Sequence, residues 1–455
     1  MLFSNTFKKN KPINLDPAHI MLLGFLALIL LGTGLLMLPF ATSDRHHLNF
    51  IDALFEATSA VCVTGLAVVD TGTTFTLFGQ IVLLILIQLG GWGFMTSGIL
   101  MFIILGKRIG LKSRLLLKES INTFSLQGVI KLVRRIILIT VIVEATGALL
   151  LAIRWSQEMS WDKAIYYGIF HSISAFNNAG FGLEPDNLSK WVGDPTVNIV
   201  ITMLFILGGI GFFVIADIFE KKSLKKLSLH TKVALLVTLI INIVSTLVIF
   251  ALEFNNPATL GSLSTIDKWW AAYFQGVVPR TAGFNTIDIS QLTLSSLTYM
   301  NGLMFIGASS GSTGGGIKVT TFAVLLFALW SVLTNKEDVN VFRRRVSKEV
   351  VFRAFSIAIS GVIFISLIFF LLTITEKGAD MSKLLFETVS AFGTVGLSAG
   401  LTGDLSPIGR ILITIMMFIG RVGPLTMAFA LAVHNYKNKN NKGKIRFAEG
   451  KILIG

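Results

Sequence analysis

Residues Phe55–Leu66 read FEATSAVCVTGL, and this stretch decides the fold because its pattern returns three more times in the 455-residue chain. In each copy an aromatic residue stands ten positions before a glycine, and an apolar residue follows that glycine. The other copies occupy Phe170–Phe181, Tyr273–Phe284 and Phe386–Leu397. Successive glycines lie 115, 103 and 113 residues apart, at Gly65, Gly180, Gly283 and Gly396. The chain therefore contains a fourfold internal repeat whose period, about 110 residues, is too long for a solenoid unit.

The composition around these repeats is that of a polytopic membrane protein. Hydrophobic residues make up 53% of the chain and charged residues only 14%, and the mean hydropathy is +0.75. Soluble chains carry about 25% charged residues, so a single soluble domain is excluded, and one cysteine excludes a disulfide scaffold. Eight apolar runs are long enough to cross about 30 Å of hydrocarbon: His19–Phe40, Gln80–Leu105, Leu132–Ile153, Val197–Phe219, Val233–Phe254, Ser296–Thr334, Val350–Thr373 and Ile408–Val433.

Basic residues near the ends of these runs predict the orientation, because Lys and Arg are retained on the cytoplasmic side. Alternate connections and the two tails hold 28 of the 39 Lys and Arg residues. The opposite connections hold nine basic residues against sixteen acidic ones. We therefore expect a multi-pass protein of the cell membrane, surrounded by lipid, with both termini in the cytoplasm. The net charge of +14 is then a topology signal, and it indicates no nucleic-acid site.

A second marker fixes the phase of the repeat. Glycines recur 24 to 28 residues after the first set, inside the following apolar runs, at Gly90, Gly208, Gly307 and Gly420. Each unit contains an even number of spans, so all four units face the same way and can surround an axis along the membrane normal, unlike inverted repeats. The expected divisions are a tail at 1–15, repeats at 16–120, 121–229, 230–345 (with a broken second helix) and 346–436, and a tail at 437–455.

Each unit is predicted to be a helix, a short re-entrant helix, a non-helical turn and a second helix. The re-entrant piece, for example Asp52–Val61, is too short to span the membrane. Unpaired backbone at membrane depth survives only where it lines a wet cavity or is buried in protein. Four such turns around one axis predict a ring of carbonyl oxygens that replaces the hydration shell of a cation, with glycine permitting positive φ. The alternative is that the glycines only let helices pack closely.

The ion favoured by this ring is monovalent, because no ring of Asp or Glu occurs at the turns to hold a divalent one. A monovalent cation bound at these carbonyls is the only metal site that we expect. The candidate filter residues are Val63, Thr64, Gly65, Asn178, Ala179, Gly180, Thr281, Ala282, Gly283, Thr394, Val395 and Gly396.

The run Ser296–Thr334 has 39 residues, which as one helix would be about 58 Å long, nearly twice the hydrocarbon thickness. We expect it to break where Gly, Ser and Thr dominate and helix propensity is lowest. Our hypothesis is that this segment lies beneath the filter, obstructs the pore and moves to admit ions; the alternative is a passive kink. The candidate gate residues are Gly307, Ala308, Ser309, Ser310, Gly311, Ser312, Thr313, Gly314, Gly315, Gly316, Lys318 and Arg421.

Two of these gate residues are cations at membrane depth, where a charge is costly unless it is paired or wet. Arg421 is expected to face the pore and repel a passing cation, or else to pair with a carbonyl or an acid. Lys318 can snorkel to a wet face. Among the acids, Glu56 and Glu387 are expected to support the short helices, and Glu144 is either functional or hydrogen-bonded in the packing.

At these residues the sequence resembles the Trk/Ktr/HKT superfamily of potassium transport proteins. The runs RTAGFNT at 280–286 and GASSGSTGGG at 307–316 carry the resemblance, which covers essentially the whole chain. It implies an all-α fold of four membrane-pore-membrane units, and eight spans look most like the Ktr B-type membrane subunit. In this family glycine in all four filters implies potassium, and serine in the first implies sodium, so Gly65 indicates potassium. The third copy departs from the others at Val277, Val278 and Arg280, so the repeat pattern determines the geometry of its turn least.

The resemblance also implies a homodimer with one pore per chain and a cytosolic RCK-type regulatory ring that binds ATP or ADP. That ring would touch the connection Lys107–Arg135 and the tail from Lys437. This chain has no soluble nucleotide domain, so nucleotide would act only through the partner. Sodium is a possible activator or co-ion for symport. The competing functions are an alternating-access carrier for another small solute or sodium, and a membrane-embedded enzyme, for which no acid-base or metal constellation recurs; we expect no catalytic residues.

Overall fold

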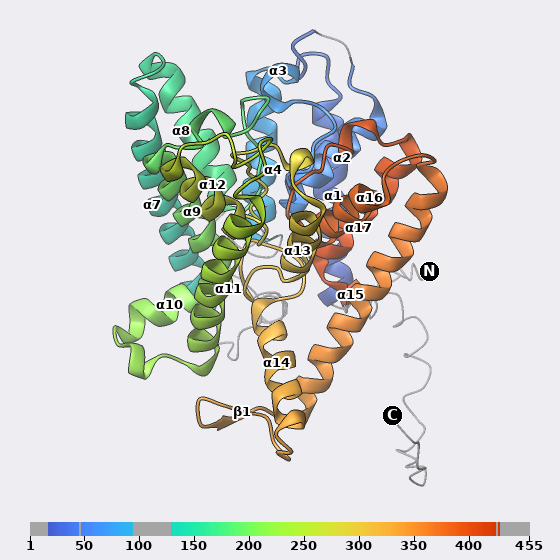
Figure 1. Cartoon of the computed structure of the whole chain (residues 1–455). Helices are drawn as coiled ribbons and strands as arrows, with labels where there is room; N and C mark the ends of the chain where they lie inside the picture. Colours follow the sequence, from blue (N-terminus) through green and yellow to red (C-terminus); the bar gives the residue numbers. More distant parts are fainter. Residues whose placement is uncertain (1–16, 45–46, 94–128, 425, 428–455) are drawn as a thin grey trace, which may run out of the picture.

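The computed structural model describes residues 17–44, 47–93, 129–424 and 426–427, and it is almost entirely helical (Figure 1). The predicted tails at 1–15 and 437–455 and most of the connection Lys107–Arg135 lie outside the described residues. Within the described residues the same order of elements recurs: a first helix, a short helix, a turn and a second helix.

The helices of this recurring order fall into three sets. The first helices are α1 (Pro17–Leu36), α7 (Val129–Trp155), α11 (Leu229–Glu253) and α15 (Lys348–Thr375). The short helices are α2 (Phe50–Cys62), α8 (Trp161–Phe176), α12 (Thr265–Val277) and α16 (Met381–Gly393). The second helices are α4 (Leu77–Trp92), α9 (Pro195–Ile210), α13 (Leu294–Phe305) and α17 (Pro407–Val422). The short helices have 13 or 16 residues, and at 1.5 Å per residue they fall short of about 30 Å.

The remaining elements lie mostly at the two ends of the molecule. Two helices follow interrupted second helices, namely α10 (Phe212–Lys221) and α14 (Val319–Leu333). A two-stranded antiparallel hairpin, β1 (Asn340–Val341) and β2 (Arg344–Arg345), joins α14 to α15. The short pieces are α3 (Thr71–Thr74), η1 (Ser189–Trp191), η2 (Leu224–Lys226), η3 (Ile289–Gln291) and η4 (Thr402–Asp404).

By length and composition, three of the described helices can each cross a membrane: α7 from Val133, α11 and α15. A fourth span results if α9 and α10 are taken together, and three shorter apolar helices are Met21–Leu36, Leu77–Trp92 and Val319–Leu333. The second and eighth predicted runs continue into residues that the structure does not describe. The count of eight spans therefore stays a prediction.

The predicted apolar run Val197–Phe219 does not form one continuous helix. The helix ends at Ile210, and α10 leaves it at an angle of 91°. Gly211 lies between the two helices with φ +101°, a conformation that residues with a side chain rarely adopt. The sixth run breaks as predicted, since α13 ends at Phe305 and α14 begins at Val319, so two of the predicted runs are broken within the described residues.

In each unit the end of the first helix, or the chain just after it, binds the start of the second helix. The hydroxyl of Thr76 donates to the carbonyl of Phe40 at 2.7 Å, and Arg154 pairs with Asp194, the N-cap of α9. In the third unit the carboxylate of Glu253 accepts hydrogen bonds from Thr293, Ser296, Asn256 and Thr259. In the fourth the carboxylate of Glu376 accepts from the backbone N–H and hydroxyl of Ser406. The contact between the first and second helices is thus made in all four units, but by different pairs of groups.

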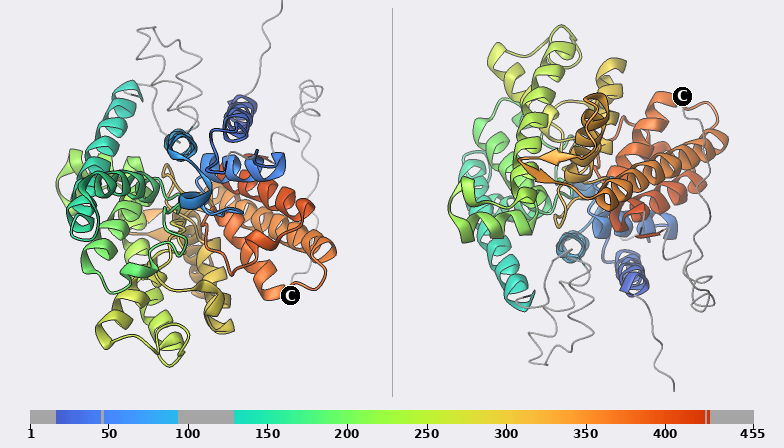
Figure 2. Two further views of the ribbon diagram at one scale, coloured as in Figure 1. Left: turned by 90° about the horizontal axis from the view of Figure 1, so that it is seen from above. Right: turned by 90° about the horizontal axis from the view of Figure 1, so that it is seen from below.

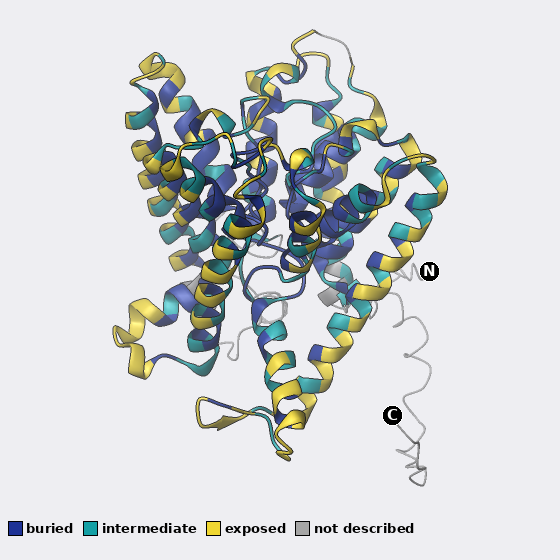
Figure 3. Cartoon of the chain, viewed as in Figure 1, coloured by how far each residue is buried: buried dark blue, intermediate teal, exposed yellow. Residues whose placement is uncertain are grey.

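Seen from above, the units follow one another around a centre in chain order, from blue through green and yellow to red (Figure 2). The last unit meets the first, because α17 packs on α2 and Arg410 forms an ion pair with Asp52. Buried residues gather around this centre, while exposed apolar residues cover the outer helix faces (Figure 3).

Candidate functional site

The four repeated glycines meet one another at this centre. A Cβ added to Gly180 would lie 2.6 Å from the Cα of Gly283, and one added to Gly283 would lie 3.4 Å from the Cα of Gly396. One added to Gly396 would lie 2.9 Å from the Cα of Gly65, and one added to Gly65 would lie 3.2 Å from that of Gly180. The four turns therefore form a closed ring in chain order.

The backbone of the four turns follows one pattern. The glycines have φ of +94°, +72°, +75° and +90° in chain order. The residue two positions before each glycine also has positive φ, at Val63, Asn178, Thr281 and Thr394. A side chain at Gly65 would overlap the carbonyl oxygen of Ala179. Glycine is thus needed here both for its conformation and because the neighbouring turn leaves no space.

Three of the short helices end in the same way. In the first unit the N–H of Val63 donates to the carbonyl of Ala60, and the N–H of Thr64 donates to Ser59. The same pair of hydrogen bonds recurs at the equivalent residues of the second and fourth units, and it is the arrangement of a Schellman motif. In the third unit the N–H of Ala282 bonds Val278 instead. The copy whose sequence departs from the other three thus also departs from them in its hydrogen bonds.

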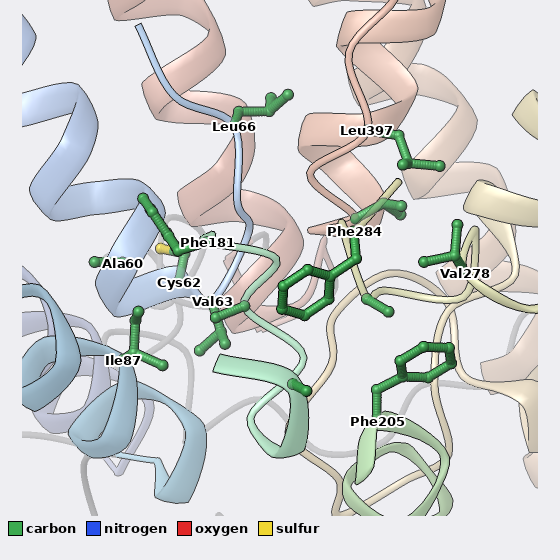
Figure 4. Close-up of a cluster of buried hydrophobic side chains, with 14 of the residues drawn as sticks. Ala60, Cys62, Val63, Leu66, Ile87, Phe181, Phe205, Val278, Phe284 and Leu397 are labelled. Carbon is green, nitrogen blue, oxygen red and sulfur yellow. The ribbon is translucent and has the colours of Figure 1, made fainter. Parts of the chain in front are cut away.

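The apolar residue after each glycine points into protein. Leu66, Phe181, Phe284 and Leu397 are all at most 2% exposed, and they lie within one cluster together with Ile87 and Phe205 from the second helices (Figure 4). The turns are thus anchored from behind by side chains, while their glycines face one another.

The acids expected to support the short helices bind the chain that leaves the turns. Glu56 accepts from the N–H of Val68 at 2.8 Å, and Glu387 accepts from the N–H of Ala399 at 3.0 Å. Both donors lie three residues after the glycine of their unit. In the second unit Nε2 of His171 occupies the equivalent place, 3.4 Å from the N–H of Leu183. The third unit has Phe274 at this position, so it has no such acceptor.

Three of the four glycines in the second set serve close packing against the short helices. A side chain at Gly90, Gly208 or Gly420 would overlap the carbonyl oxygen of Val61, Phe176 or Phe392 respectively. Each of these carbonyls belongs to the residue four positions before the ring glycine. The close-packing interpretation thus fits the second marker, whereas the ring glycines contact the neighbouring turns.

The segment 306–318 lies against three of the four turns. The hydroxyl of Thr313 donates to Oδ1 of Asn178 at 2.7 Å, and the N–H of Gly315 donates to the hydroxyl of Thr394 at 2.9 Å. A side chain at Gly314 would overlap the hydroxyl of Thr281. Asn178, Thr281 and Thr394 are the residues two before the ring glycines, so the segment contacts the same level of each turn.

The segment is also attached to the other broken span. The N–H of Ser309 donates to the carbonyl of Gly209 at 2.9 Å, and the N–H of Phe212 donates to Gly311 at 2.9 Å. The break between α9 and α10 is therefore hydrogen-bonded to the break between α13 and α14. The sequence marks Gly208, Gly209 and Gly211 only as part of the repeat, and it does not predict this joint, because the hydrogen bonds join residues about 100 positions apart.

The two cations of the gate candidates bind carbonyl oxygens. Arg421 donates to the carbonyls of Thr313 and Gly90, and Nζ of Lys318 donates to Gly314 at 2.6 Å. Two roles were expected for Arg421, and the observed hydrogen bonds agree with the second, in which it pairs with a carbonyl. Both cations bind the same segment, which is thus held from α17 and from the start of α14.

Glu144 belongs to a buried polar cluster beside the second turn. Nδ2 of Asn177 lies 3.0 Å from Oε1 of Glu144 and 3.0 Å from Oε1 of Gln88. The hydroxyl of Ser172 donates to the backbone carbonyl of Glu144. These contacts join α4, α7 and the end of α8, which favours the packing interpretation of Glu144. Neither Asn177 nor Gln88 is recognisable from the sequence as a member of this cluster.

A cavity of about 280 Å³ lies outside the ring, between the first and second turns. Gly65 and Gly180 line it on the side of the ring, and Asp70, Glu184 and Asn187 are among its polar lining residues. Nδ2 of Asn187 donates to the carbonyl of Gly180. Two acids beside two ring glycines make this mouth attractive to cations.

Comparison with known proteins places this geometry in a family. A family model described as "TrkH: Cation transport protein" matches residues 5–442. The chain is 47% identical to the Ktr system potassium uptake protein B of Bacillus subtilis over 99% of this chain and 100% of that protein. It is 43% identical to the protein of the same name from Vibrio alginolyticus, over 98% and 97%. It is 38% identical to the potassium/sodium uptake protein NtpJ of Enterococcus hirae, over 98% and 99%.

The crystal structure of the potassium transporter TrkH from Vibrio parahaemolyticus matches with a TM-score of 0.73. The match covers 93% of this chain and 86% of that one at 20% identity, so it shows the fold. The predicted resemblance is confirmed, and the chain is a multi-pass membrane transporter and not an enzyme. The family model and the similarity to the relatives lead to one conclusion: the chain belongs to the TrkH family of cation transport proteins.

Proposed function

We propose that this chain takes up potassium across the cell membrane through a selectivity filter made of its four turns. One observation carries the proposal: Gly65, Gly180, Gly283 and Gly396 form a closed ring, with positive φ at each glycine and two residues before it. The main-chain oxygens of residues 63–65, 178–180, 281–283 and 394–396 are the proposed ligands that replace water around the ion. The names of the relatives favour potassium as the ion.

The surroundings of the ring support a cation as its occupant. The short helices end at the turns, so their C-terminal partial negative charges lie nearest the ring. Asp70 and Glu184 at the outer mouth raise the local concentration of cations. We assign the filter no Asp or Glu ligand. Neutral carbonyl ligands suit a singly charged ion, because the ion must bind strongly enough to enter the filter and weakly enough to leave it.

The segment Gly307–Gly316 is the proposed gate. It contacts Asn178, Thr281 and Thr394 directly beneath the ring. Arg421 and Lys318 would hold it there through its own carbonyls. Because these two charges also lie below the filter, they would add an electrostatic barrier to a passing cation. Opening would require the segment to leave both cations and the turns together.

The finer assembly is also a proposal. We place the repeat boundaries near residues 120, 229 and 345, eight spans in the membrane and both termini in the cytoplasm. We further propose a homodimer and a cytosolic RCK-type ring that binds ATP or ADP and controls the gate, with nucleotide acting only through that partner. The name of NtpJ mentions sodium, which favours sodium as a co-ion or activator here. Capture of a soluble nucleotide-binding partner by the purified chain would test the regulatory proposal.

The alternative is an alternating-access carrier for another small solute or for sodium. Broken helices in two units, at Gly211 and at 306–318, are a feature that such carriers share. The orientation of the repeats still favours a pore, because carriers of that kind are commonly built from inverted halves.

Rubidium uptake into liposomes tests the proposal. Vesicles that contain the purified chain should take up labelled rubidium, and external potassium should suppress the uptake far more than equimolar sodium. Gly302→Ala supplies a control, since nothing lies within 4 Å of a Cβ added there. Uptake indistinguishable from empty vesicles, or equal suppression by both ions, would contradict a potassium filter.

A further inference from the structure

A second and larger cavity lies on the opposite side of the ring from the acidic mouth. Its volume is about 610 Å³, and it lies between α10, the start of α11, α14, the hairpin and the start of α15. In Figure 1 these elements lie at the lower end of the molecule. Their connections are those whose basic residues predict the cytoplasmic side. The cavity therefore lies on the predicted cytoplasmic side.

The cavity combines apolar walls with two arginines. Side chains such as Val324, Phe327 and Ile357 form the walls, and Arg344 of β2 and Arg353 of α15 also line it. Neither arginine side chain makes an ion pair or a hydrogen bond with another of the described residues. The neighbouring Arg345, by contrast, pairs with Asp338 at 2.9 Å. No acid is among the described residues that line the cavity, so its charge is uncompensated.

The helices around the cavity present apolar side chains outward at the same level. Trp330 on α14 is 63% exposed and Phe352 on α15 is 71% exposed, and exposed residues cover the lower parts of both helices (Figure 3). Tryptophan is enriched where a membrane meets water. The cavity thus lies beside a surface that suits the boundary between lipid tails and headgroups.

We propose that this cavity binds an anionic phospholipid. The phosphate would lie between Arg344 and Arg353, since guanidinium groups bind phosphate through paired hydrogen bonds, and an acyl chain would lie along Val324 and Phe327. Basic cavities between membrane helices on the cytoplasmic side are suited to such headgroups. A free phosphate would satisfy the arginines but would leave the apolar walls unfilled, which is why we assign a lipid.

The bound lipid would contact the gate candidate directly. Ser310 lines the cavity, and its hydroxyl lies 3.2 Å from that of Thr320, which also lines it. The adjacent Gly311 accepts the hydrogen bond from Phe212. The same cavity therefore has walls from both broken spans. The binding proposal itself does not depend on potassium transport, so either can fail alone.

Native mass spectrometry of the purified full chain tests the binding. Phosphatidylglycerol and phosphatidylcholine with the same acyl chains are titrated into the chain in neutral detergent. We expect phosphatidylglycerol to bind at least about tenfold more tightly, and Arg344→Gln with Arg353→Gln to weaken it roughly 25-fold, about fivefold per charge. Lys225→Gln with Lys226→Gln removes two exposed charges on the same side, outside the cavity, and should leave binding unchanged.

A second variant keeps the charges and fills the space. Val324→Trp should also abolish tight binding of phosphatidylglycerol, and elution as a single species on size exclusion verifies that each variant is folded. Equal binding of the two lipids would overturn the proposal, as would an arginine variant that behaves like the lysine control. Displacement of the lipid by millimolar inorganic phosphate would overturn it too, because the site would then bind a free anion.

Discussion

The ring depends on a residue type that can take positive φ and has no Cβ. At Gly65 both conditions apply, since φ is +94° and a side chain would overlap the carbonyl of Ala179 in the next turn. The residues two positions earlier have positive φ as well but carry side chains, and Val63, Thr281 and Thr394 among them are β-branched. Such conformations cost of order 1–3 kcal/mol each. Strain of this kind persists only where the surroundings determine the backbone, as the anchored side chains behind the turns do here.

Gly65→Ala should reduce rubidium uptake at least tenfold and lower the preference for potassium over sodium. The added methyl group displaces the carbonyl of Ala179, a proposed ligand. Uptake into liposomes with each ion as competitor measures both effects. Gly302→Ala, in a helix with free space, should transport normally; loss of uptake in both variants would remove the specific role of the ring.

Arg421 combines the two expected roles, a bond to a carbonyl and a charge near the ring. Its guanidinium donates to Thr313 of the segment and to Gly90 of α4, so it fastens the segment as well as placing a charge below the ring. Arg421→Ala should raise uptake, because a hydrogen-bonded contact and a barrier are removed together. Arg421→Lys distinguishes the two, since lysine keeps the charge but cannot bridge both carbonyls. Lowered or unchanged uptake in Arg421→Ala would contradict both roles.

At the scale of elements, three units hold the chain after the turn with a side chain from the short helix. Glu387 is the most extensive case, because its carboxylate accepts from Ser398, Ala399, Leu401 and Thr402. It is fully buried, so removing it leaves several buried donors without an acceptor. The unit that lacks this acceptor, with Phe274, is also the unit whose short helix ends differently.

Glu387→Ala should destabilise the protein by at least about 3 kcal/mol, since each unsatisfied buried donor costs about 1–3 kcal/mol. Thermal unfolding in detergent, followed by size exclusion, measures the loss. Glu349→Ala, an exposed acid at the start of α15, is the matched control and should unfold like the parent chain. Equal unfolding temperatures for the two variants would show that the acid does not hold the turn.

The proposed gate, the segment Gly307–Gly316, can be tested by shortening it. Deletion of Ser309–Gly314 removes the contacts to Gly209, Phe212 and Arg421, and it should raise rubidium uptake if the segment obstructs the pore. Uptake equal to that of the parent chain would favour the passive kink instead.

Particular residues show what the sequence could and could not predict about these elements. The turns were predictable because aromatic and glycine positions recur, and the break at 306–318 because ten residues of mostly Gly, Ser and Thr interrupt an apolar run. The bend at Gly211 was not, since its cause includes the hydrogen bond from Phe212 to Gly311, about 100 residues away. Likewise, the sequence does not show that His171 and Glu56 are equivalent. The equivalence follows from the structure, in which each accepts a hydrogen bond from the backbone N–H three residues after the glycine of its unit.

At the scale of the whole molecule, charge is divided between the two faces. The predicted outer connections have an acidic excess, and Asp70 and Glu184 bring some of it to the cavity beside the ring. The predicted inner connections and tails hold most of the basic residues. If the ring is the filter, an acidic mouth would steer cations toward it by a field that salt screens.

Glu184→Gln should therefore raise the KM for rubidium about two- to fivefold at low ionic strength. The effect should vanish near 1 M salt, where the Debye length is about 3 Å. Asp186→Asn, an exposed acid of the same loop that does not line the cavity, is the control and should change KM less. A KM shift that persists at high salt would argue that Glu184 acts through local structure.

The contact between the last unit and the first has a consequence for how the protein is made. Asp52 and its partner Arg410 are separated by 358 residues, which at about 5–20 residues per second is roughly 20 to 70 s of translation. During that time α2, which is too short to cross the bilayer, has no completed neighbour on one flank. The nascent protein must shelter this half-inserted helix from lipid until the final quarter emerges from the ribosome, so late truncations should be recognised as unfinished and degraded.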